Sequence, residues 1–94
     1  MRSIELVIAN PSGLHARPAA LFVQEAARFP CSITVANLDR AGKAVDAKSI
    51  LMLMTIGISH GHRIRIIADG QLENEALAAL EALVTSGLGE ASHT

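Results

Sequence analysis

The chain has 94 residues, half of them apolar, with two phenylalanines as its only aromatic residues, one cysteine and a formal net charge of −1. This length predicts a single domain over residues 1–94, with its core at about residues 3–89 built from aliphatic side chains and methionine. The balanced charge argues against a nucleic-acid partner, and the lack of an apolar run of about 18 residues argues against membrane insertion. A single cysteine excludes an internal disulfide, and the first residues do not follow the pattern of a signal peptide, so we expect a cytoplasmic protein. The sequence gives no sign of oligomerisation, so we expect a monomer.

The first half of the chain predicts a strand, a helix and a second strand. Residues 3–9 alternate in part and are rich in branched side chains, which is typical of a strand. Turn-forming residues follow, and apolar side chains at three- and four-residue spacings then predict a helix over 16–29, which Pro30 ends. Residues 31–37 alternate again and predict a strand with one covered face, in which Cys31 is a small buried side chain rather than a nucleophile.

The second half predicts two further strands and two helices. A turn at 38–42 leads to a short edge strand at 43–47, and Ser49 is a good N-cap for a short helix from Ile50 to about Thr55. Residues 63–68 predict a strand, residues 74–86 a long amphipathic helix, and residues 90–94 a tail. The order β-α-β-β-α-β-α predicts an α+β, open-faced two-layer sandwich with a four-stranded antiparallel sheet and three helices on one face, while periodicity leaves the strand order open.

The sequence around His15 is the first candidate site. Asn, Pro, Ser and Gly at 10–13 predict a loop, and Pro18 suits the first turn of a helix. With His15 at or beside the N-cap, the amides of Ala16 and Arg17 point out of the helix end and can bind an anion. The guanidinium of Arg17 suits phosphate, and the imidazole of His15 is a nucleophile near neutral pH. We therefore predict that His15 carries a phosphoryl group, although a surface histidine without a function is the alternative.

Residue types that are absent from the sequence near His15 narrow the reactions that this site can support. No carboxylate lies nearby in the sequence to activate water, and no glycine-rich loop with a lysine predicts ATP binding. A site that can hold phosphate without a means to obtain or hydrolyse it indicates a carrier. The sequence therefore predicts phosphoryl relay rather than autonomous catalysis.

The apolar run from Ile50 to Met54 is the second candidate site. Five consecutive apolar residues cover every side of a short helix, so some of them face another element or a partner. By spacing, Ile50, Leu51 and Met54 share one face and predict a partner-docking surface, whereas Met52 and Leu53 point toward the core.

Three other features have weaker functional interpretations. Ser49 is most simply a cap, and its phosphorylation would put charge beside the apolar run. Arg28 either stabilises the end of the first helix or joins Arg17 in a basic rim around the docking surface. His60 and His62 lack the third ligand that a zinc site needs, so we predict no metal.

The assembled motifs resemble those of the HPr family, the histidine-containing phosphocarriers of the bacterial phosphoenolpyruvate-dependent sugar phosphotransferase system. The resemblance runs from about residue 4 to residue 89 and is most specific in GLHARPA at 13–19 and KSIL at 48–51. It implies that Nδ1 of His15 accepts a phosphoryl group from enzyme I and passes it to an enzyme IIA-type domain, with Arg17 steadying the group. It also implies docking through Ile50, Leu51 and Met54, and modification of Ser49 by an HPr kinase in some branches.

The resemblance has several further implications. It implies no cofactor of the chain's own, since magnesium and phosphoenolpyruvate are used by enzyme I, and it adds transcriptional regulators as partners. Residues 61–65 and 86–90 look especially like HPr-like domains of multiphosphoryl transfer fusions. Alternatives left open are a carrier of the nitrogen-regulatory branch and a binding module that never exchanges phosphate.

Overall fold

Four strands and three helices make up the computed structural model, which describes residues 1–40 and 43–90. In chain order they are β1 (Arg2–Val7), α1 (Ala16–Ala27), β2 (Ser32–Asn37), β3 (Ala44–Asp46), α2 (Ile50–Met54), β4 (Arg63–Asp69) and α3 (Glu73–Thr85). The predicted order of elements is confirmed. The end of the predicted turn, at 41–42, and most of the predicted tail, at 91–94, lie outside the described residues.

The sheet places the first strand beside the last. Its order is β1-β4-β2-β3, and every neighbouring pair is antiparallel. The short strand β3 lies at an edge, as predicted from the hairpin pattern. Because β1 pairs with β4, the loop that follows β1 meets the segment that precedes β4: the amide of Ile8 donates to the carbonyl of His62 at 2.9 Å, and that of Gly61 donates to the carbonyl of Ile8 at 2.7 Å.

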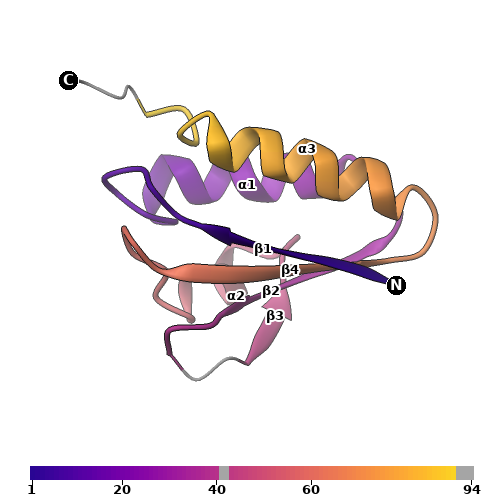
Figure 1. Cartoon of the computed structure of the whole chain (residues 1–94), viewed down its shortest axis with the longest axis horizontal. Helices are drawn as coiled ribbons and strands as arrows, with labels where there is room; N and C mark the ends of the chain where they lie inside the picture. Colours follow the sequence, from indigo (N-terminus) through magenta and orange to yellow (C-terminus); the bar gives the residue numbers. More distant parts are fainter. Residues whose placement is uncertain (41–42, 91–94) are drawn as a thin grey trace.

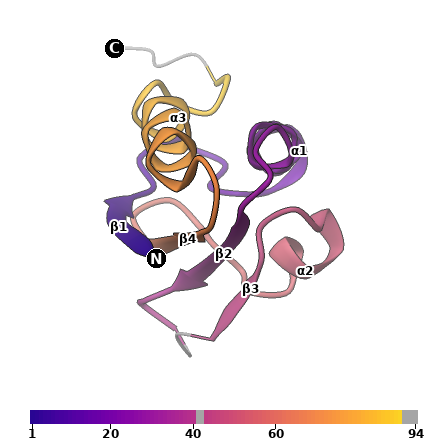
Figure 2. The ribbon, with the colours of Figure 1, turned by 90° about the vertical axis from the view of Figure 1, so that its right-hand side faces the viewer.

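Two long helices cover one face of the sheet. Helices α1 and α3 lie side by side above the strands (Figures 1 and 2), and α2 contacts α1 and β3. The alternating side chains of β2 and β4 point into this layer, where they pack against both long helices. Fully buried members of this core include Phe22, Ile33, Val35, Ile64, Ile66 and Leu80. The predicted open-faced α+β fold is therefore confirmed, and Cys31 is buried as expected.

Two predicted boundaries were wrong by two residues. Strand β1 ends at Val7 rather than Ala9, because Ile8 turns fully into the core and pairs with the segment before β4. Helix α1 ends at Ala27 rather than Phe29, because Arg28 is its C-cap and the amide of Phe29 donates to the carbonyl of Ala26 in a tighter turn. Within the described residues, no helix has the length and hydropathy needed to cross a membrane.

Candidate functional site

The loop before α1, residues 8–15, is called the His15 loop and is tightly fitted to its neighbours. Gly13 has a φ of +64°, and a Cβ at this position would lie 2.5 Å from the carbonyl oxygen of Ile58, so glycine is required both by conformation and by space. The amide of Leu14 donates to the same carbonyl at 3.0 Å, and the Leu14 side chain is buried. These contacts hold the loop against the segment before β4.

His15 is the N-cap of α1, as predicted. Its backbone is extended (φ −124°, ψ 154°), its side chain makes no capping hydrogen bond, and it is half-buried. No acidic residue lies in the first turn of α1, so the partial positive charge of the helix start is not neutralised from within that turn. Ala16, the first helical residue, has a φ of +52°, a left-handed conformation that costs a residue with a Cβ about 1–2 kcal/mol.

The exposed Arg17 follows directly, and the next residue, Pro18, is buried. Because the first amides of a helix have no partner within the helix, those of Ala16 and Arg17 remain available, and Pro18 has no amide to offer. Within residues 1–40 and 43–90, Arg17 forms no ion pair. The structure therefore brings the predicted residues His15, Ala16 and Arg17 together at one helix start that can receive an anion.

The short helix α2 presents the largest group of exposed apolar side chains. We call Ile50, Leu51, Met52 and Met54 the α2 patch; their exposed fractions are 45%, 75%, 41% and 43%. Leu53 is buried as predicted, but the prediction that Met52 points to the core was wrong. A helix of five residues directs one side chain fully inward here, and Met52 lies beside it on the exposed side.

Ser49 and Lys48 fix the start of α2. The Ser49 hydroxyl accepts a hydrogen bond from the amide of Met52 at 3.2 Å, which confirms the predicted cap. The ammonium group of Lys48 donates to the carbonyl of Phe29 at 2.6 Å and so ties this start to the end of α1. The α2 patch is thus held at a defined place beside α1.

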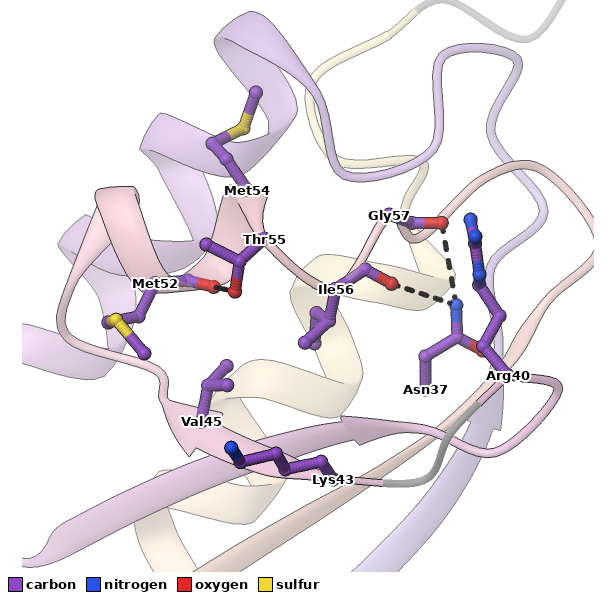
Figure 3. Close-up of a pocket in the computed structure, with 9 residues that line it drawn as sticks. All are labelled: Asn37, Arg40, Lys43, Val45, Met52, Met54, Thr55, Ile56 and Gly57. Atoms are coloured by element: carbon purple, nitrogen blue, oxygen red, sulfur yellow. Dashed lines mark hydrogen bonds between the residues drawn. The ribbon is translucent and has the colours of Figure 1, made fainter.

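A cavity of about 380 Å³ adjoins the α2 patch (Figure 3). It lies between the β2–β3 hairpin and α2, with Met52 and Met54 on one side and two cationic side chains, Arg40 and Lys43, on the other. Asn37, which is buried at the end of β2, donates to the carbonyls of Ile56 and Gly57 at 3.3 and 3.4 Å and forms part of its wall. Sequence reasoning missed Asn37, since a polar residue at the end of a strand has no local signal of burial.

The remaining predicted residues are separated. Arg28 lies at the opposite end of α1 from Arg17, about 16 Å away along the helix axis, where it pairs with Glu25 at 2.7 Å. His62 accepts hydrogen bonds at Nδ1 from the Ser59 amide and the Asn37 side chain, each at 3.0 Å, while His60 is exposed. No group of three potential metal ligands among His, Cys, Asp and Glu occurs in the described part of the chain.

Glu90 belongs to the folded domain, so the prediction of a tail starting at this residue was wrong. Its carboxylate accepts hydrogen bonds from the Asn10 side chain, the Ser12 amide and the Ser12 hydroxyl at 2.7, 2.9 and 2.7 Å. These bonds, that from Asn10 foremost, hold the pKa of Glu90 below its usual value. The buried Leu88 two residues earlier is the one sequence signal for this contact, because an apolar residue just past a helix end often packs back on it.

The fold and the site define a small α+β protein with a histidine at the start of α1 and an exposed apolar patch on α2, which contacts α1. The family model described as "PTS HPr component phosphorylation site" matches residues 2–86. The chain belongs to the HPr family of phosphocarriers of the phosphotransferase system (PTS).

Individual relatives agree with this assignment. The multiphosphoryl transfer protein of Haemophilus influenzae is 42% identical over 84 residues, which are 89% of this chain and 17% of that protein. The chain therefore spans about a fifth of the length of the multiphosphoryl transfer proteins that it matches. The crystal structure of HPr-C-His from Thermoanaerobacter tengcongensis is 43% identical, with a TM-score of 0.91 over 98% of this chain and all of that one.

A third relative has a different assembly. The crystal structure of Bacillus subtilis Crh, the catabolite repression containing protein, is described as a dimer with a swapping domain. It is 41% identical, with a TM-score of 0.69 over 99% of this chain and all of that one. Since members of the family include dimers, the predicted monomeric state of this chain stays a prediction.

Proposed function

We propose that the chain is a cytoplasmic phosphocarrier that accepts a phosphoryl group on Nδ1 of His15 from phospho-enzyme I and passes it to an enzyme IIA-type domain for sugar uptake. The observation that carries this proposal is the position of His15 at the start of α1, beside free amides and Arg17, with no acidic residue in the first turn of that helix. Membership of the HPr family supports the same chemistry.

In the proposed step, the lone pair of Nδ1 attacks the phosphorus of the enzyme I phosphohistidine. A new P–N bond forms at His15 while the donor's P–N bond breaks, and the bonding electrons return to the donor imidazole. The ring proton on each histidine's other nitrogen stays in place, so no base is required. The amides of Ala16 and Arg17 and the guanidinium of Arg17 stabilise the negative charge of the transferring group.

Docking is assigned to the α2 patch. Leu51 and its neighbours offer apolar area on α2, which contacts α1, with Arg17 and Arg28 at the two ends of α1 as the cationic border. A small apolar surface suits a carrier, which has to release one partner before it meets the next. Magnesium and phosphoenolpyruvate act on enzyme I, and the chain itself supplies no cofactor.

The direct test is phosphorylation by enzyme I with magnesium and labelled phosphoenolpyruvate. Wild type is expected to gain an acid-labile phosphoryl group, and His15→Ala is expected to lose it. His60→Ala is the matched control, because His60 is exposed and lies outside the His15 loop. Retention of the label by His15→Ala would overturn the site assignment.

A second candidate is a regulatory binding module that acts through the α2 patch, a role that the likeness to Crh and the position of Ser49 favour. Phosphorylation of Ser49 by an HPr kinase would place a dianion at the start of α2, next to the apolar side chains that a partner or a transcriptional regulator would contact. Incubation with HPr kinase and ATP, followed by mapping of the modified serine, tests this role. An unmodified Ser49 contradicts it.

A carrier of the nitrogen-regulatory branch differs from the sugar-branch carrier only in which enzyme I paralogue phosphorylates it. The phosphorylation assay on His15, run with both enzyme I paralogues, therefore separates the two branches.

A further inference from the structure

The carboxylate of Glu90 joins the end of the described chain to the His15 loop. One oxygen accepts from the Asn10 side chain and the Ser12 amide, and the other accepts from the Ser12 hydroxyl. The contacts span about 80 residues of sequence, so they form only when the fold is complete. We call this arrangement the Glu90 clamp.

Packing of the turn after α3 places Glu90 at the His15 loop. After α3, Leu88 is fully buried with a φ of +54°, and its amide donates to the carbonyl of Leu83 at 3.1 Å. A Cβ at Gly89 would lie 2.6 Å from Cδ1 of Leu21 on α1, so this turn fits closely against that helix. The Glu90 amide donates back to the carbonyl of Gly87 at 3.0 Å. The side chain of Glu90 therefore starts from a fixed backbone.

The clamp continues through the loop toward His15. The Asn10 side chain, which is buried, also donates to the carbonyl of Gly13 at 2.9 Å, and the Gly13 amide donates to the carbonyl of Asn10 at 3.2 Å. The amide of Leu14 donates a hydrogen bond to the carbonyl of Ile58, and His15 is the next residue. This network fixes the backbone directly before His15, and the left-handed Ala16 follows directly after it.

We propose that Glu90 is a positioning residue for phosphoryl transfer at His15, a role that rests on the proposed function of His15. Its carboxylate holds residues 10–13, which set the direction in which the His15 backbone enters α1. In-line transfer depends on the placement of the attacking nitrogen to within a fraction of an ångström. The clamp acts through the loop and touches neither the α2 patch nor Arg17 in the described structure.

The test compares Glu90→Ala, Glu90→Gln and the control Glu81→Ala in steady-state transfer from enzyme I. Glu81 is exposed on α3, so its replacement removes the same charge without touching the loop. Glu90→Ala is expected to lower kcat by about tenfold with KM for the carrier unchanged, because placement of the nucleophile is lost and docking is not. Glu90→Gln is expected to recover most of kcat, because its amide still accepts from Asn10 and the Ser12 amide and can donate to the Ser12 hydroxyl. Glu81→Ala is expected to match wild type.

Amide hydrogen exchange provides a readout that does not depend on transfer. The Ser12 amide is expected to exchange faster in Glu90→Ala than in wild type, with Tm and the exchange of β4 amides showing that the domain remains folded. If wild type is labelled on His15 but the kcat of Glu90→Ala lies within twofold of the wild-type value, only the positioning role is overturned. Wild type that takes up no label overturns the proposed function, and the positioning role with it.

Discussion

The His15 loop and the α2 patch differ in solvent exposure and in how many hydrogen bonds hold them. The loop is anchored by the buried Ile8 and Leu14, hydrogen-bonded to two distant segments and built around a glycine that no other residue can replace without strain. The α2 patch is apolar and exposed, on a helix of five residues whose single fully inward side chain is Leu53. A reacting nitrogen needs fixed geometry, whereas a docking surface for successive partners needs accessible area that can adapt, as methionine does. Under the proposed function, the loop would therefore govern the chemical step and the patch the affinity for partners.

Of the substitutions that test the two regions themselves, the one in the His15 loop is expected to have the largest effect. Gly13→Ala is expected to destabilise the fold by about 3 kcal/mol, because a Cβ there meets the carbonyl of Ile58 in a backbone with positive φ. Urea denaturation measures the change. Gly61→Ala is the control, since its φ is also positive (+88°) but nothing lies within 4 Å of the added carbon, and about 1 kcal/mol is expected. Equal losses in the two variants would show that close fitting at Gly13 contributes nothing.

The patch side is tested by Leu51→Ala. Leu51 is 75% exposed, so its truncation is expected to change the free energy of unfolding by less than about 0.5 kcal/mol. The KM for transfer from enzyme I is expected to rise about tenfold with kcat unchanged, opposite to the effect of Glu90→Ala. Leu53→Ala is the contrast, because truncation of this buried side chain is expected to lower the free energy of unfolding by about 2–5 kcal/mol. An unchanged KM in Leu51→Ala would remove the α2 patch from the docking surface.

Ser49 tests how firmly the patch is anchored. Ser49→Ala removes the hydroxyl that accepts from the Met52 amide and is expected to cost about 1 kcal/mol of stability. Denaturant titration of this variant, with Ser59→Ala as a control at an exposed serine that is not a helix cap, measures the change. Equal stability of Ser49→Ala and wild type would mean that the Ser49 cap contributes nothing to the stability of α2.

The smallest expected effect is the acid sensitivity of the Glu90 clamp. Hydrogen bonds from Asn10 and Ser12 lower the pKa of Glu90 from its ordinary 4.5. A lowered pKa in the folded state contributes stability above about pH 4.5 that is lost as the pH falls through the folded-state value. The pKa of Glu73 is lowered as well, by the Gly70 amide, so part of the acid sensitivity remains without Glu90. Tm measured between about pH 6 and pH 3 should therefore fall less in Glu90→Ala than in Glu81→Ala, and parallel curves would contradict the clamp.

The residues that act locally could be predicted from the sequence. His15 at the start of α1 follows from the turn residues before it and Pro18 after it, and Ser49 at the cap of α2 follows from the apolar run that it precedes. The order of elements follows from periodicity, and so does the buried face of α1. Each of these inferences depends on neighbours within about one helical turn.

The features that depend on distant contacts could not be predicted. Strand order β1-β4-β2-β3 is set by the packing of whole elements, and the periodicity of a single strand carries no information about it. Met52 was misplaced because a run of five apolar residues has no polar side to orient it. Glu90 was missed because its partners, Asn10 and Ser12, lie at the other end of the chain.

The central claim, that His15 is the phosphoryl acceptor, is tested most directly by NMR of the wild-type chain. Protein labelled with ¹⁵N at histidine is phosphorylated by enzyme I, magnesium and phosphoenolpyruvate, and the ³¹P–¹⁵N couplings identify the modified nitrogen. The predicted result is a single phosphoramidate on Nδ1 of His15, with the rings of His60 and His62 unmodified. Coupling to another histidine, or no phosphoramidate in the presence of active enzyme I, would contradict the account.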